Sequence, residues 1–335
     1  MPQYGLAYSK LRDAVVHWEA AYDFEAFEAH VNAMPQFTTT VFGRRLHFAH
    51  RVVDGDAPTV LMLHGWPGSF LEFHAVVEDA AMAGFNLVVP SMLGYGLSEA
   101  PTTAGVDPVA HAQVFAALMK RLGYTSYVVQ GGDWGGMIAA VVAQIDPACT
   151  ALHTNFFPAI PTPRWWLLSE EDVEKSRYPM PTLGLHGLDI TGYMHQQATR
   201  PDTTAAAVMA SPTALLAWLL EKVEAWSDAA TRPPLDAILH DISLYYFTNT
   251  IAPSMRLYYD HFHSMRMWSS LLSQVHKPTA LLDFPHEMIR IAEPVARAKF
   301  TNIASYTTAS SGGHFAAWER PAMFACHVAA FVNAQ

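Results

Sequence analysis

Short apolar runs alternate with helix-like segments through the first half of this chain, and this alternation constrains the fold more than any other feature. Three runs have the length and continuous apolarity of strands buried on both faces, at residues 59–63, 86–90 and 127–130. Helix-like segments lie between and after them, at 69–82, 107–122 and 135–145. This order predicts an α/β fold, with a parallel sheet that helices cover on both faces.

The two ends of the chain extend the pattern. Residues 37–53 alternate and are rich in β-branched and aromatic residues, which predicts strands joined near Gly43. Apolar residues at helical spacing precede them at 7–32. Toward the C-terminus we expect further strands and helices at 278–284, 291–299, 303–308 and 319–333. The sheet is therefore expected to take strands from both halves of the chain.

The alternation stops between about Phe156 and His276, where the chain becomes aromatic, Pro-rich and helix-like. This stretch holds five of the nine tryptophans, namely Trp165, Trp166, Trp218, Trp226 and Trp268. We expect an N-terminal arm and the first part of the core at 1–155, a mainly helical lid at 156–276, and the rest of the core at 277–335. The aromatic residues of the lid predict a dry, aromatic-lined pocket between lid and sheet.

Composition excludes several classes of protein. Hydrophobic residues make up 51% of the chain and charged residues 15%, which excludes a disordered protein. The net charge of −10 has the wrong sign for binding nucleic acid. The apolar stretch at Val208–Leu220 is too short to span a membrane, and charges near the N-terminus argue against a signal peptide. We therefore expect a cytoplasmic protein without a membrane anchor.

Cysteine and histidine give no sign of a metal site. The two cysteines, Cys149 and Cys326, are too few for a disulfide framework, and we expect both as buried free thiols. The histidines form no HExxH motif and no cluster with cysteine. Their closest pair, His261 and His263, is more simply a chance pair than a set of ligands. We expect no bound metal.

A strand, a tight turn and a helix meet around Asp133. The strand at 127–130 leads into Gly131-Gly132-Asp133-Trp134-Gly135-Gly136 and then into an apolar helix. This spacing is typical of a nucleophile elbow, in which a nucleophile stands on a strained turn. The glycines permit the turn and the close packing of helix on strand. The alternative is an aspartate that caps the helix.

The aspartate at the nucleophile position decides the chemistry. A serine would need a base and would attack a carbonyl carbon. The carboxylate of Asp133 is ionised at neutral pH, and it can displace a leaving group from saturated carbon to form an alkyl ester. This substitution argues against a serine esterase.

Two further loops have places in the same mechanism. The strand at 59–63 runs into His64-Gly65-Trp66-Pro67-Gly68, where a loop supplies a backbone N–H to an oxyanion hole. We assign the two donors to Trp66 and Trp134; an ordinary β-turn is the alternative for this loop. His314 lies in a Gly-rich loop after the last strand, where the base of such a triad falls.

Longer segments over nearly the whole chain carry a specific resemblance. They are PQFTTTVFGRRLHFAH (35–50), HGWPGSFLEF (64–73), GYGLSEAP (94–101), GGDWGG (131–136), GYMHQQATRPDT (192–203), SPTALLAWLLEK (211–222), FTNTIAPSMRLYY (247–259), FPHEM (284–288) and GGHFAAWERP (312–321). In these the chain resembles epoxide hydrolases of the microsomal type, which have the α/β-hydrolase fold. One departure is a shortened N-terminal arm, since family members usually carry a longer arm before residues 22–37.

The resemblance implies a role for each matching residue of a triad. It makes Asp133 the nucleophile, His314 the base that activates water, and Glu287 the acid that orients His314. Asp283 is the rival acid, because it ends a strand where many hydrolase acids stand.

The resemblance also implies that Tyr193 and Tyr258 of the lid hold the epoxide oxygen. Tyr259 is the rival to Tyr258. For any of these tyrosines the alternative is a packed aromatic residue whose hydroxyl is hydrogen-bonded.

The implied reaction converts a small apolar epoxide and water to a vicinal diol through an ester on Asp133, without a cofactor. A haloalkane dehalogenase shares the aspartate and histidine but has no use for two lid tyrosines. A catalytically silent binding module of the same fold would not need all these side chains together. The sequence leaves the epoxide and the oligomeric state open, with a homodimer as one arrangement.

Overall fold

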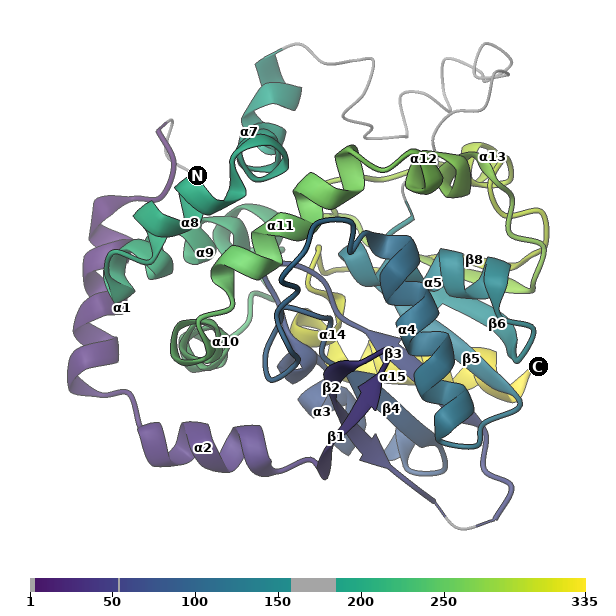
Figure 1. Ribbon diagram of the computed structural model, residues 1–335. Helices are drawn as coiled ribbons and strands as arrows, with labels where there is room; N and C mark the ends of the chain where they lie inside the picture. Colours follow the sequence, from purple (N-terminus) through teal and green to yellow (C-terminus); the bar gives the residue numbers. More distant parts are fainter. Residues whose placement is uncertain (1–3, 54, 158–184) are drawn as a thin grey trace.

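The computed structural model describes residues 4–53, 55–157 and 185–335 (Figure 1). Among these residues, eight strands form one sheet in the order β1-β2-β4-β3-β5-β6-β7-β8. Their bounds are β1 Gln36–Val41, β2 Arg44–Arg51, β3 Thr59–Leu63, β4 Asn86–Pro90, β5 Tyr127–Gly131, β6 Cys149–Thr154, β7 Thr279–Asp283 and β8 Ile303–Thr308. β2 pairs antiparallel with β1 and β4, and the other neighbouring strands are parallel. The predicted, mostly parallel α/β sheet is confirmed.

Helices cover both faces of this sheet. α4 (Pro108–Arg121) and α5 (Asp133–Ile145) lie side by side on one face, and α3 (His74–Glu78) and α15 (Pro321–Asn333) pack together on the other (Figure 1). As a result β3, β4, β5 and β7 bury every residue. This explains why these strands read as continuous apolar runs without alternation.

The antiparallel edge of the sheet is a hairpin. Phe42 and Gly43 join β1 to β2 with φ of 49° and 76°, as a two-residue turn between twisted strands requires. The turn predicted near Gly43 is therefore confirmed. Antiparallel pairing follows directly, because so short a connection can only return the chain alongside itself.

Two predicted helices are interrupted by local caps. The helical region expected at 7–32 is α1 (Tyr8–Ala20) and α2 (Phe24–Asn32), because the Asp23 carboxylate accepts the first backbone N–H groups of α2. The helix expected at 69–82 is wrong as a single element. It consists of η1 (Phe70–Phe73), α3 and η2 (Ala80–Met82), with Ser69 and Asp79 as caps.

A second group of helices lies between β6 and β7 in sequence. Its bounds are α7 Leu185–Thr199, α8 Pro201–Val208, α9 Pro212–Trp226, α10 Leu235–Thr248, α11 Ile251–Phe262 and α12 Met265–Leu272. α7 to α11 gather on one side of the core (Figure 1). Trp226 is buried, and Trp218 and Trp268 are half-buried. Trp165 and Trp166 lie outside the described residues.

The C-terminal part holds α13 (Glu293–Ala296), α14 (Ala316–Glu319) and α15, so the helix expected at 291–299 is shorter than predicted. Cys149 is buried as expected, but the expectation for Cys326 is wrong, because its side chain is exposed. Phe324, Val328 and Phe331 mark the buried stripe of α15. Cys326 lies on the opposite side of that helix.

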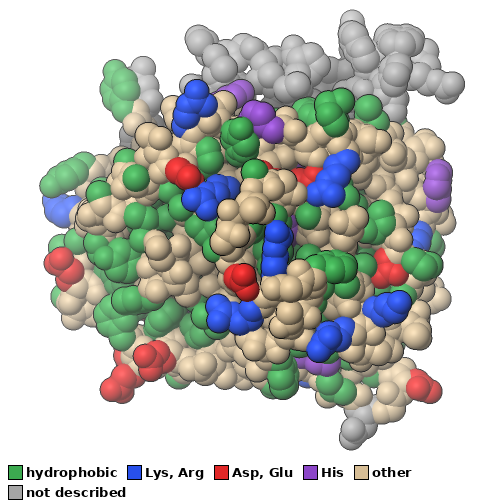
Figure 2. Space-filling view, in the orientation of Figure 1, with side chains coloured by type: hydrophobic (Ala, Val, Ile, Leu, Met, Phe, Trp, Pro, Cys, Tyr) green, Lys and Arg blue, Asp and Glu red, His purple; other side chains and the backbone are tan. Residues whose placement is uncertain are grey.

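The described part of the chain has no single helix with both the length and the apolarity to cross a membrane. α8 and α9 meet that length and composition only when taken together, and the chain bends by 117° between them. Acidic and basic side chains are interspersed on the face shown in Figure 2.

Candidate active site

The predicted elbow is formed between β5 and α5. Asp133 is the first residue of α5 and has a φ of 49°, a left-handed conformation that strains any residue with a Cβ. Close packing explains the neighbouring glycines. A Cβ on Gly131 would lie 2.2 Å from the Gly135 carbonyl oxygen, and one on Gly135 would lie 2.0 Å from the Leu63 carbonyl oxygen. The turn therefore needs glycine at both positions.

The Asp133 carboxylate points toward the loop after β3. The Trp66 N–H donates to Asp133 Oδ1 at 2.8 Å. Gly65 allows this approach, since a Cβ there would lie 2.3 Å from Asp133 Cβ. The N-cap of α5 is Gly132, and no side chain caps this helix, so the alternative of a capping aspartate is wrong. The Trp134 N–H belongs to the first turn of α5, where amides have no intrahelical partner.

His314 lies between two carboxylates. Its Nδ1 is 2.8 Å from Glu287 Oε1, and its Nε2 is 3.3 Å from Asp133 Oδ2. Burial of the imidazole disfavours its charged form, but the Glu287 and Asp133 carboxylates outweigh that effect. The pKa of His314 is therefore raised well above its ordinary value.

The structure brings Glu287, and not Asp283, to His314. Glu287 is buried, and its Oε1 also accepts the Met288 N–H at 2.7 Å, which fixes the carboxylate. Asp283 ends β7 and is also buried, but it pairs with Arg290 through both oxygens. The ion pair with Arg290 holds Asp283 away from His314.

Aromatic rings surround Asp133 on the side of α7 and α11. Tyr193 of α7 stacks on Trp66 with 5.3 Å between ring centroids, and Tyr258 of α11 meets Trp134 edge-on at 4.7 Å. The two tyrosine rings are 5.8 Å apart. Burial raises the pKa of both hydroxyls, so both carry a proton at neutral pH. The two hydroxyls lie close enough for each to influence the pKa of the other.

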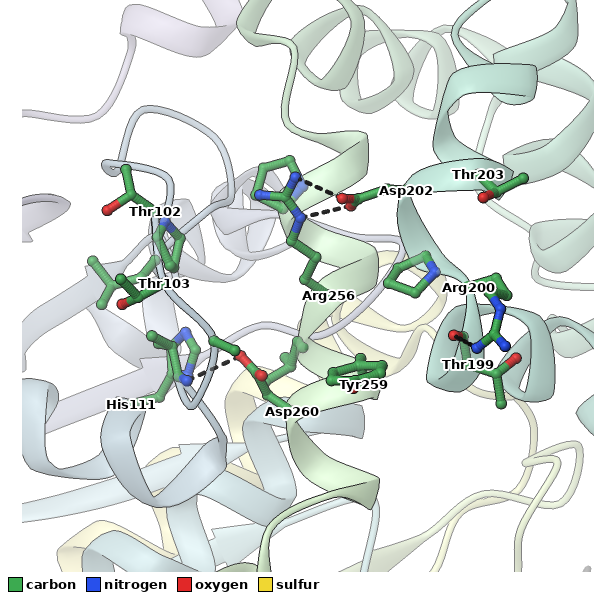
Figure 3. Close-up of a pocket in the computed structure, with 17 residues that line it drawn as sticks. Thr102, Thr103, His111, Thr199, Arg200, Asp202, Thr203, Arg256, Tyr259 and Asp260 are labelled. Atoms are coloured by element: carbon green, nitrogen blue, oxygen red, sulfur yellow. Dashed lines mark hydrogen bonds and ion pairs between the residues drawn. The ribbon is translucent and has the colours of Figure 1, made fainter.

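Tyr259 lies on a different face of α11. Its ring stacks on His263 and lines a cavity of about 480 Å³ with Thr199, Asp202 and Arg256 (Figure 3). Neither Asp133 nor His314 lines this cavity, so we do not place the chemistry there despite its size. The structure thus brings Tyr258, and not Tyr259, to the nucleophile.

A smaller cavity of about 20 Å³ lies against the nucleophile and the histidine. Besides Asp133 and His314, its polar lining includes Glu72, Gln130 and Asn155. None of these three residues was assigned a role from the sequence. Glu72 belongs to the HGWPGSFLEF segment, eight residues after His64. Its place in a segment that carries the family resemblance was the one feature of the sequence that could have pointed to it. Burial, followed by the charge of Asp241, raises the pKa of Glu72 well above its ordinary value.

Metal ligands do not converge in the described part of the chain, where no group of three His, Cys, Asp or Glu could hold an ion. His261 packs against Trp134, whereas His263 stacks on Tyr259. The two rings therefore contact different aromatic residues.

Comparison with known families supports one assignment. Residues 1–73 match the model of the epoxide hydrolase N terminus, and residues 58–174 match that of the alpha/beta hydrolase fold. Epoxide hydrolase 1 of Sus scrofa is 33% identical over 98% of this chain and 81% of its own length.

Solved structures agree with this result. The epoxide hydrolase of Aspergillus niger is 32% identical, with a TM-score of 0.86, over 99% of this chain and 86% of that one. The juvenile hormone epoxide hydrolase of Bombyx mori is 30% identical, with a TM-score of 0.88, over the same shares. These likenesses extend over both the sheet and the helices between β6 and β7.

Proposed function

Since this chain belongs to the epoxide hydrolase family of the α/β-hydrolase fold, we propose that it opens an apolar epoxide through a covalent ester on Asp133. One observation carries the proposal. Glu287, His314 and Asp133 form a continuous array, and the Trp66 N–H holds one oxygen of the Asp133 carboxylate. The array supplies a nucleophile, a base and an oxyanion donor within one buried site.

Ring opening is the first step. The N–H of Trp66 engages Asp133 Oδ1, which leaves Oδ2 to attack an epoxide carbon. The hydroxyls of Tyr193 and Tyr258 donate to the epoxide oxygen and stabilise the alkoxide as the C–O bond breaks. A phenol that keeps its proton at neutral pH suits this task, and burial raises the pKa of both side chains.

Esterification of Asp133 then prepares His314 as a base. The raised pKa of His314 depends in part on the negative charge of Asp133. The ester is neutral, so one of the two anionic neighbours is lost and the pKa of His314 falls. The proton that His314 releases neutralises the alkoxide of the opened ring. Neutral His314 can then take a proton from water, while Glu287 stabilises the imidazolium that forms. The substrate itself therefore switches the histidine from acid to base.

Hydrolysis of the ester regenerates the enzyme. Water attacks Asp133 Cγ, and the negative charge develops on the oxygen that already lies against the Trp66 N–H. With the Trp134 N–H as second donor, this is an oxyanion hole, and loss of one such donor typically costs about 3 kcal/mol. The ester bond breaks and the vicinal diol leaves.

A single turnover in oxygen-18 water tests the covalent route. We expect the label in the Asp133 side chain and not in the first equivalent of diol, because water attacks the carboxyl carbon. Peptide mass spectrometry locates the label. A labelled diol with unlabelled Asp133 would show direct attack of water on the epoxide and would refute the ester.

The substitution His314→Gln tests the base. The variant should form the ester and then stop, giving a stable mass increase equal to that of the substrate. An unmodified protein after incubation with a turned-over epoxide would contradict the assigned role of His314.

The dehalogenase reading shares Asp133 and His314 but leaves the two phenols unexplained. The presence of both Tyr193 and Tyr258 beside the nucleophile favours an epoxide. Parallel assays of diol formation and halide release distinguish the two activities. The cytoplasm as compartment and the homodimer remain predictions, which cell fractionation and light scattering test.

A further inference from the structure

The small cavity beside the nucleophile has the dimensions and polarity of a water site. Its volume is about 20 Å³, and roughly 10–15 Å³ is enough for one water molecule that has two to four polar partners. Asp133 and His314 form part of its wall, and four more polar side chains line it, those of His64, Glu72, Gln130 and Asn155. A water in this cavity would lie beside both the nucleophile Asp133 and the base His314.

One acceptor at this cavity has no hydrogen-bond partner among the described residues, and the carboxyl of Glu72 lies beside the same space. The Gln130 side chain donates to Asn155 at 3.1 Å, but its own Oε1 is buried and finds no partner among the residues that the structure describes. The Glu72 carboxyl lines the same cavity and interacts electrostatically with His314 and Asp133. Gly68 makes room for that carboxyl, since a Cβ there would lie 1.3 Å from Glu72 Oε1. Buried acceptors of this kind are normally satisfied by protein or ordered water.

We propose that Glu72 is a positioning residue that orients the water for hydrolysis of the Asp133 ester, with Gln130 as its second acceptor. The inference rests on the proposed function, because it concerns the second half of that reaction. One O–H of the water points to His314 Nε2, and the other points to Glu72 or Gln130. A lone pair of the water oxygen is thereby directed at Asp133 Cγ.

The step balances without any further reactant. His314 Nε2 takes one proton as the water oxygen bonds to Asp133 Cγ. The ester C–O bond then breaks, and the departing alkoxide of the diol receives the proton from His314. The second proton of the water passes from the Asp133 carboxyl back to His314, which regenerates the carboxylate. Glu72 neither gains nor loses a proton. Its raised pKa agrees with a group that accepts hydrogen bonds as a neutral acid, which places no negative charge beside the developing oxyanion.

Two substitutions of similar shape separate a water-orienting role from a packing role. Glu72→Met keeps the length of the side chain but removes the acceptor, whereas Glu72→Gln keeps an acceptor oxygen. In rapid-quench single turnovers we expect ester formation within about twofold of the parent in both variants. Ester hydrolysis should slow by about ten- to a hundredfold in E72M, as the loss of a buried hydrogen bond implies, and stay within about threefold in E72Q.

Asp283→Asn is the matched control. Asp283 is a buried carboxyl at the end of β7 that does not line the cavity, and its substitution should leave both rates within about threefold. Equal rates in E72M and the parent would overturn the proposal. So would an E72Q as slow as E72M, which would indicate a carboxylate base, or equal slowing of both steps, which would indicate misfolding. Failure of the parent to form an ester would instead refute the proposed function.

Discussion

The substitution Glu287→Gln removes one charge from the centre of the site while keeping the shape of the side chain. In the parent, Glu287 Oε1 lies 2.8 Å from His314 Nδ1, and both side chains are buried. His314 becomes an imidazolium when it takes a proton from water, so the charge of Glu287 acts mainly in that step. We expect the variant to form the ester and to hydrolyse it slowly.

The distance sets the size of the effect. Two unit charges 2.8 Å apart interact by about 6 kcal/mol at an effective dielectric constant of about 20. With about 1.4 kcal/mol for each tenfold change in rate, this corresponds to a ceiling of about 10⁴-fold. Glu287 also accepts the Met288 N–H, which shares its charge, so we expect a slowing of about 10³-fold.

Rapid-quench mass spectrometry measures ester formation and ester hydrolysis separately. Asp283→Asn is the control, because Asp283 is also buried but pairs with Arg290. This control should lose stability, since Arg290 is left unpaired, and keep its hydrolysis rate within about threefold. A slowing below tenfold in E287Q, or equal slowing in the two variants, would refute the assignment of the acid.

Three further predictions follow from the same geometry. Tyr258→Phe should slow ester formation about tenfold and spare hydrolysis, whereas Tyr259→Phe should leave both within about twofold in single turnovers. Burial raises the pKa of Asp241 to about 8. The folded protein therefore keeps a proton that the unfolded chain loses near pH 4, and stability falls as pH rises between these values. Asp241→Asn should remove this loss, by about 5 kcal/mol over the whole range, as measured by denaturant unfolding at pH 5 and pH 8. Gly65→Ala should displace Asp133 and lower kcat/KM about a hundredfold.

The sequence predicted those parts of the fold that depend on periodicity. Continuous apolar runs marked β3, β4 and β5, because strands covered on both faces have no polar side. It failed where capping competes with periodicity. Asp23 divides one expected helix and Asp79 another, and a side-chain acceptor that serves neighbouring amides leaves no trace in the apolar pattern.

The candidate site divides in the same way. The elbow at Asp133 could be predicted from its glycines, since each of them stands where a Cβ would collide with a neighbouring part of the backbone or with a side chain. The preference for Glu287 over Asp283 came from the resemblance alone, because the partner that engages Asp283 is Arg290, seven residues away on an irregular loop. Glu72 could not be identified from the sequence, because its carboxyl occupies space that is free only since Gly68 has no Cβ. Such a contact produces no pattern in the sequence.

Tyr258 and Tyr259 are neighbours on α11, so the rotation of this helix about its axis determines which of the two phenols faces Asp133. Successive residues of an α-helix are rotated by about 100°, which is why one ring contacts Trp134 while the next lines the outer cavity. Deleting one residue from α11 before Tyr258 would turn Tyr259 toward the nucleophile. A substitution scan would report tyrosine as essential at one position only. A scan by insertion and deletion would show that either tyrosine can serve when the helix presents it.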